Sequence, residues 1–166
     1  MNPYLSIPFL LIVSLLQSTA APRLQIGAVW PDFLLLVVMS WALAQRLDEA
    51  VGWALVGGMG VDLLSGGPFG ASAIGLMLVA LIAGVTSSGL FRGRAMLPIV
   101  TAFLATLAFH LVYMLAMLLV GQRVDVLDAL LRLALPSAVY NAVLSMIVYW
   151  IMAGIDRRIR PKALRW

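Results

Sequence analysis

The chain has 166 residues, of which 63% are hydrophobic and 11% charged, and its mean hydropathy is +1.05. A water-soluble core of this size cannot enclose so many apolar side chains, whereas a lipid bilayer can. The formal net charge of +4 resides entirely in residues 156–166, which argues against a nucleic-acid-binding surface. The absence of Cys excludes disulfides, thiolate metal ligands and cysteine nucleophiles.

Six apolar segments separated by short polar breaks follow one another along the chain. A bilayer-crossing helix needs about 20 residues, and backbone inside lipid must pair its own polar groups, which favours helices. We therefore expect an all-α integral membrane protein with six transmembrane helices in one bundle. Residues 1–155 would form this domain and residues 156–166 a basic cytoplasmic tail. The predicted spans lie near 4–22, 30–45, 50–65, 71–91, 95–120 and 136–155.

The first segment shares one feature with a cleaved signal peptide. An apolar run over residues 7–16 is followed by small residues at 18–21. No Lys or Arg precedes the run, although a signal peptide begins with a positively charged region. We expect an uncleaved first span, with cleavage after the small residues as the alternative.

The basic residues are distributed unevenly between the predicted loops. With six spans and a cytoplasmic C-terminus, eight bases lie inside, while Arg23, Arg123 and Arg132 lie outside. This asymmetry follows the positive-inside rule, so both termini are expected in the cytoplasm. Five of the inner bases are expected to contact anionic lipid headgroups. These are Arg157, Arg158, Arg160, Lys162 and Arg165.

Segment 121–135 is too charged to cross the membrane. Asp128 and Arg132 stand four residues apart, the spacing of a helical ion pair, and apolar residues recur on another face. We expect a short amphipathic helix lying at the outer interface, and docking of a partner is an additional use of that surface.

Asp62 needs an explanation, because a carboxylate at the centre of a membrane helix costs roughly 2.5–3.5 kcal/mol on insertion scales. Gly58, Asp62, Gly66 and Gly70 recur every four residues, which places the acid on a groove of small residues while the helix lasts. We expect another backbone to approach this groove closely. The alternative is an acid that reaches the interface from a helix end.

Five polar residues fall in the outer half of the bilayer in the predicted topology: Asp32, Asp62, His110, Tyr140 and Asn141. We expect an outward-facing cavity or a docking surface there, with a helix terminus, Tyr140 or Asn141 donating hydrogen bonds to Asp62. His110 is interpreted as a packing residue, because no metal-ligand spacing accompanies it. No catalytic motif or phosphate-binding loop is present, so neither an enzyme, a metal nor a cofactor is expected.

Three motifs resemble those of the rod shape-determining protein MreD family. Residues 58–70 resemble its G-x-x-x-D-x-x-x-G-x-x-x-G signature, and residues 31–35 are similar to its P-D-L-x-L. Residues 136–141 are similar to its P-x-x-x-Y-N. The order and spacing of the motifs and the length of the chain also match, so the resemblance covers the whole chain.

The resemblance implies a non-enzymatic scaffold of the bacterial elongasome in the inner (cytoplasmic) membrane. It implies direct binding to MreC, a single-span protein, and membership of the same assembly as MreB, RodZ, RodA and a class B penicillin-binding protein. The family is also distantly similar in fold to the substrate-binding subunits of energy-coupling-factor vitamin transporters. A small-molecule-binding transport subunit is therefore the alternative function, and an enzyme acting on lipids is a third, less favoured one.

These hypotheses differ in what they require of the fold. A scaffold is expected to present its small-residue grooves to a helix of another protein. A transport subunit is instead expected to enclose a cavity with aromatic and polar residues.

The topology predicts opposite labelling of two introduced cysteines in this Cys-free chain. Gln122→Cys should react with a membrane-impermeant thiol reagent applied from outside, whereas Gly93→Cys should react only after permeabilisation, because the two positions lie on opposite sides. Labelling from outside at 93 but not at 122 would overturn the six-span orientation.

Overall fold

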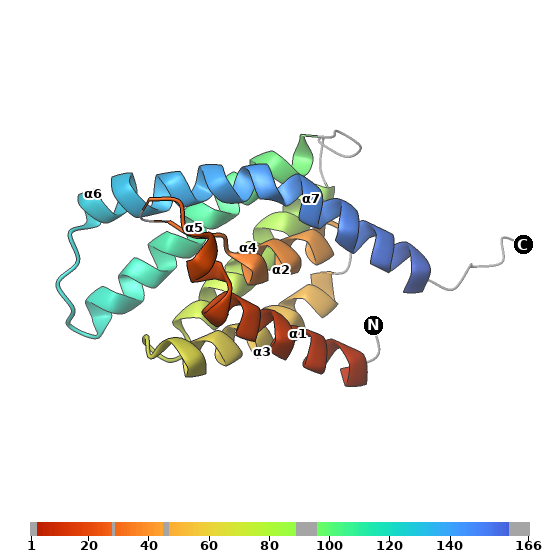
Figure 1. The fold of residues 1–166 in the computed structure, drawn as a ribbon, viewed down its shortest axis with the longest axis horizontal. Coiled ribbons are helices and arrows are strands. Elements are labelled where there is room, and N and C mark those ends of the chain that lie inside the picture. The colour runs from red at the N-terminus through yellow and green to blue at the C-terminus, as the bar shows by residue number, and fades with distance from the viewer. Residues whose placement is uncertain (1–2, 28, 45–46, 89–95, 160–166) are drawn as a thin grey trace, which may run out of the picture.

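The computed structural model describes residues 3–27, 29–44, 47–88 and 96–159. Within these ranges the chain is helical, and the strand-like pairing is limited to one bridge between Ile26 and Val29. The main helices are α1 (Pro3–Thr19), α2 (Phe33–Leu43), α3 (Leu47–Ser65), α4 (Ala71–Ser88), α5 (Leu97–Leu119) and α7 (Leu135–Ile159) (Figure 1). Shorter elements are a 3-10 turn (Ala21–Leu24), α6 (Val126–Ala129) and a π-helical turn (Leu130–Ala134).

The six main helices match the six predicted spans in order, which confirms the all-helical class. Among the described residues, two helices are long and apolar enough to cross a bilayer, α5 and the continuous helix over residues 126–158. The 11-residue α2 is shorter than the predicted segment 30–45. At 1.5 Å per residue it is about 16 Å long, roughly half of a hydrocarbon core of about 30 Å. Insertion and orientation in a membrane stay predictions.

Helix α2 is the centre of the bundle. It is apolar on all sides, and every residue from Leu34 to Leu43 is buried. It contacts α1, α3, α4, α5 and α7. A helix that is hydrophobic all round needs neighbours on every face, so the position of α2 determines where the others pack.

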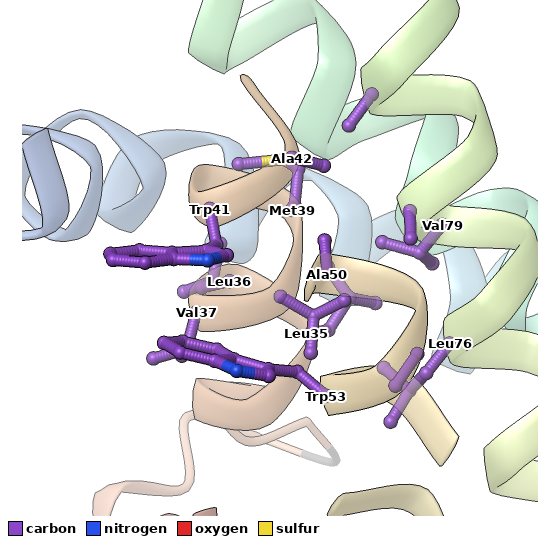
Figure 2. Close-up of a cluster of buried hydrophobic side chains, with 14 of the residues drawn as sticks. Leu35, Leu36, Val37, Met39, Trp41, Ala42, Ala50, Trp53, Leu76 and Val79 are labelled. Carbon is purple, nitrogen blue, oxygen red and sulfur yellow. The ribbon is translucent and has the colours of Figure 1, made fainter. Parts of the chain in front are cut away.

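Stacked aromatic rings join α2 to its neighbours. Trp41 on α2 stacks on Trp53 of α3, with ring centroids 4.5 Å apart and planes inclined by 13° (Figure 2). Phe9 of α1 packs against Trp53, with ring centroids 5.8 Å apart and planes inclined by 54°. The indole nitrogen of Trp41 donates to the Glu49 carboxylate at 3.0 Å, which satisfies the polar end of a buried ring.

Helices α3 and α4 form a hairpin whose backbones touch at Gly58. A Cβ atom added there would lie 2.4 Å from the Cα and 2.6 Å from the backbone nitrogen of Ala73. No side chain fits in such a contact, so glycine is required by the close approach itself. The groove at Gly58 is therefore occupied by α4 of the same chain.

Segment 121–135, predicted as a short amphipathic helix at the outer interface, is helical from Val126 and continuous with α7. Asp125 caps α6 by accepting the Asp128 amide, and helix continues through the π-helical turn into α7. Pro136 lacks an N–H and disturbs the regular ladder, and the wider π-helical turn lies just before it. The ion pair between Asp128 and Arg132 is confirmed, and both side chains are exposed.

The C-terminal part of α7 extends into the predicted tail. The helix continues to Ile159, with Asp156 buried and Arg157 and Arg158 exposed. In Figure 1, α7 ends at the same end of the molecule at which α1 begins, opposite to α6. Several bases used in the topology prediction lie outside the described residues, namely Arg46, Arg92, Arg94, Arg160, Lys162 and Arg165.

The contact at Gly58 predicts that alanine substitutions at two glycines of α3 have very different effects on the unfolding temperature. Gly58→Ala should lower the unfolding temperature of the detergent-purified protein, because the added methyl group collides with backbone atoms of Ala73. Gly52→Ala is the matched control, since no heavy atom lies within 4 Å of its added Cβ. It should be neutral or stabilising by up to about 1 kcal/mol from helix propensity. Equal unfolding temperatures for the two variants would contradict the close approach.

Candidate functional site

The N-terminus of α2 lies inside the bundle, and side chains from three parts of the chain accept hydrogen bonds from its backbone amides. The Asp32 carboxylate accepts the Leu35 amide at 3.0 Å and so caps its own helix. The Asp32 amide donates to Asn141 Oδ1 of α7 at 3.0 Å. The Phe33 amide donates to Gln17 Oε1 of α1 at 2.7 Å. The first amides of a helix have no partner within the helix, and here neighbouring helices provide acceptors.

The two amide side chains at this helix end are held by further hydrogen bonds. Asn141 is fully buried and donates through Nδ2 to Thr106 Oγ1 of α5 at 3.3 Å. Gln17 donates through Nε2 to the Pro31 carbonyl at 3.2 Å. Each side chain thus uses both its acceptor and its donor, which fixes its orientation. The network ties α1, α5 and α7 to the start of α2.

Asp62 caps the next buried helix start. It is 3% exposed, and its two oxygens accept the amides of Gly70 at 2.7 Å and Ser72 at 3.1 Å. These amides belong to the turn and first residues of α4, so the acid is paired with a helix terminus. Asn141 and Tyr140, the two side chains expected to donate to Asp62, form hydrogen bonds elsewhere. Asn141 serves α2, and the Tyr140 hydroxyl donates to the Leu24 carbonyl at 3.1 Å.

The remaining glycines of the 58–70 motif do not lie on a helical groove, so that part of the prediction is wrong. Helix α3 ends at Ser65, and Gly66 follows with φ +66°, while Gly70 has φ +90°. No heavy atom lies within 4 Å of a Cβ added at either position. Both glycines are needed for left-handed backbone in the turn between α3 and α4, a conformation other residues rarely adopt.

A cavity of about 420 Å³ lies beyond the N-terminal end of α2. Every main helix contributes to its wall. Of the predicted polar residues, Asp32, His110 and Asn141 line it. Asp62 and Tyr140 are not among its lining residues. The full lining is Gln17, Ser18, Pro22, Val29, Trp30, Asp32, Leu34, Val61, Leu64, Ser65, Ser72, Leu76, Phe109, His110, Tyr113, Leu133, Ser137 and Asn141.

Sequence reasoning missed Gln17, Thr106 and Tyr113. Gln17 had a usable signal, because it is a primary amide at the end of an apolar run. Thr106 and Tyr113 lie in the fifth segment near His110 and carry no such signal, since both residue types occur in membrane helices without a partner of note. His110 itself bonds through Nδ1 to the Thr106 carbonyl at 2.9 Å, one turn back on the same helix.

Within the described part of the chain, no group of three His, Cys, Asp or Glu residues is arranged to hold a metal ion. Asp32, Asp62 and His110 are the side chains of this region whose types commonly act as acids or bases in enzymes. Two of them cap helices and the third bonds its own helix. These three side chains form hydrogen bonds with backbone groups in a low-dielectric interior.

The family model for the rod shape-determining protein MreD matches residues 1–158. The chain belongs to the MreD family. This family consists of structural membrane proteins with a role in rod shape determination and is not known as an enzyme family. No curated protein matches the chain, and no solved structure matches it.

Substitutions of Asp62 distinguish a role in helix capping from a chemical role of its carboxylate. Asp62→Asn keeps an oxygen that accepts one of the two amides, so the fold should tolerate it. Asp62→Leu leaves the amides of Gly70 and Ser72 unpaired, at about 1–3 kcal/mol for each. Thermal unfolding in detergent and the cell shape of a complemented deletion strain should rank both variants in the same order. Normal folding of the Asn variant without rod shape would instead assign a chemical role to the acid.

Proposed function

We propose that this chain is a non-enzymatic, multi-pass scaffold of the bacterial inner membrane that binds MreC and helps to organise cell-wall synthesis by the elongasome. MreB, RodZ, RodA and a class B penicillin-binding protein would belong to the same assembly, in direct contact or through other subunits. The observation that carries the proposal is the family match over residues 1–158. It covers nearly the whole chain, so the role is that of the entire bundle.

The use of the buried polar groups supports a structural role. Asp32 and Asp62 cap helices α2 and α4, and Asn141 and Gln17 complete the first of these caps. These bonds fix the relative positions of helices and leave the bundle with defined faces. A scaffold needs such rigidity, because its partners must find their contact surfaces in constant positions.

The outer faces of α5 and α7 support insertion in lipid and contact with partner helices. These two helices expose large aliphatic side chains along much of their length, including Leu111 and Leu115 on α5 and Val143, Ile147 and Ile151 on α7. Such continuous apolar faces are stable in hydrocarbon and not in water. With the six-crossing topology, the exposed Arg157 and Arg158 at the end of α7 would lie at the cytoplasmic headgroups.

The small-residue groove is not available to MreC at Gly58, because Ala73 of α4 already fills it. The contact with MreC is therefore proposed to involve other helix faces. This changes the test from substitution of the glycine motif to direct detection of the partner.

A second candidate function is a substrate-binding subunit of a small-molecule transporter. The specific observation in its favour is the cavity of about 420 Å³, where Trp30, Phe109 and Tyr113 meet polar residues. Ligand pockets commonly have volumes of about 300–1,000 Å³.

Affinity purification from native membranes distinguishes the two functions. The tagged chain should recover MreC by mass spectrometry at levels far above those from a tagged, unrelated six-helix protein of the same membrane. Deletion of its gene should give rounded cells, and Gly52→Ala should restore the rod shape. Recovery of transporter ATPase subunits without MreC, with rod shape unchanged by the deletion, would favour the second function and refute the first.

A further inference from the structure

The cavity beyond α2 holds polar groups that the fold itself does not use. Ser72 and Ser137 are only 3% and 6% exposed, and both line the cavity. Their hydroxyls bond to no described residue. They differ from Ser40 and Thr101, whose unpaired hydroxyl oxygens are fully enclosed. Buried polar groups without partners are costly, so hydroxyls that open on a cavity indicate a site for a polar ligand or water.

Asp32 and His110 each have one side-chain atom that forms no hydrogen bond with a described residue. One oxygen of Asp32 caps α2 through the Leu35 amide, and the other accepts no hydrogen bond from the described residues. His110 uses Nδ1 toward a carbonyl, so that nitrogen carries a proton, and in the neutral ring Nε2 is an acceptor. The Tyr113 hydroxyl also lines the space. The cavity therefore presents an acidic group and an additional acceptor to whatever enters it.

The Asp32 carboxylate lines the cavity and would repel an anionic ligand. No Lys or Arg is among the described residues of the cavity wall. The positive ends of the adjacent helices are also occupied, because Asp32, Asn141 and Gln17 use amides of α2 and Asp62 uses those at the start of α4. A phosphate or carboxylate would find only hydroxyl and imidazole donors in the wall, and it would lie near the Asp32 carboxylate. The wall instead favours a positive charge.

The rest of the wall is apolar and partly aromatic. Leu34, Val61 and Leu76 form apolar surface, and Trp30 and Phe109 add aromatic rings. Aromatic faces attract cations, and apolar walls bury a hydrocarbon body.

We propose that this cavity binds an amphipathic amine, with the ammonium group on Asp32 and the apolar body against the aromatic and aliphatic wall. Two sources have this chemistry: a free small amine, and an aminophospholipid whose ammonium group enters the cavity while its phosphate stays outside. The site goes beyond the scaffold role and does not depend on MreC, so loss of MreC binding would leave it intact.

The first experiment compares three probes that share one body. Phenethylammonium, 2-phenylethanol and phenylacetate are titrated against the purified full-length protein in detergent, and thermal unfolding and calorimetric binding are measured. Phenethylammonium should raise the unfolding temperature and bind with saturation, whereas the neutral and anionic probes should not. Equal effects of the three probes, absence of any effect, or preference for phenylacetate would overturn the proposal.

Two variants test whether the cavity is the site. Asp32→Asn preserves a good N-cap for α2 and should weaken phenethylammonium binding by about tenfold or more. Leu64→Trp alters a half-exposed lining residue and should obstruct the cavity if the first variant folds poorly. Asp128→Asn is the matched control, because this exposed carboxylate lies outside the cavity. Unchanged binding in a folded Asp32 or Leu64 variant would exclude the site.

Lipid discs identify the source of the natural amine. Discs of phosphatidylglycerol alone are compared with discs that also contain phosphatidylethanolamine. Weaker apparent binding of phenethylammonium in the second kind shows that the lipid headgroup competes for the cavity. Equal binding in both assigns the site to a free amine.

Discussion

The start of a helix inside a low-dielectric interior is the constraint on which this fold depends. Helix α2 has 11 residues and is buried from Leu34 to Leu43, and Asp32 and Phe33 at its start are half-buried. Unpaired amides are costly there. Asp32, Gln17 and Asn141 each accept one of them, and they come from the chain just before α2, from α1 and from α7. Pairing one helix end therefore sets the positions of two other helices.

The same solution recurs at α4, where Asp62 accepts amides from Gly70 and Ser72. Asp32 and Asp62 thus both accept amides at helix N-termini, which are favourable places for negative charge. The short α2 also explains the cavity, because the bundle continues beyond its N-terminus while the central helix does not. Residues of α1, α3, α4, α5 and α7 line one cavity at that level, together with Asp32 and Leu34.

The glycines of residues 58–70 show how one spacing serves different purposes. Gly58 permits contact between α3 and the backbone of Ala73, while Gly66 and Gly70 provide left-handed backbone in the turn. The period of four predicts a common helix face only while the helix lasts, and α3 ends at Ser65. Gly66 with φ +66° directly follows Ser65 and ends the helix, a stop signal that the period of four does not include.

The sequence by itself determined the helical class, the order of the six main helices, the Asp128–Arg132 pair and the polar character of Asp32, Asp62 and Asn141, because hydropathy and local spacing are properties of short segments. Tertiary structure decided which partners these side chains have. Asn141 bonds to α2 and α5 rather than to Asp62, and α6 continues through a π-helical turn into α7. Such pairings join residues far apart in the chain, and each buried donor takes the acceptor that packing brings within reach.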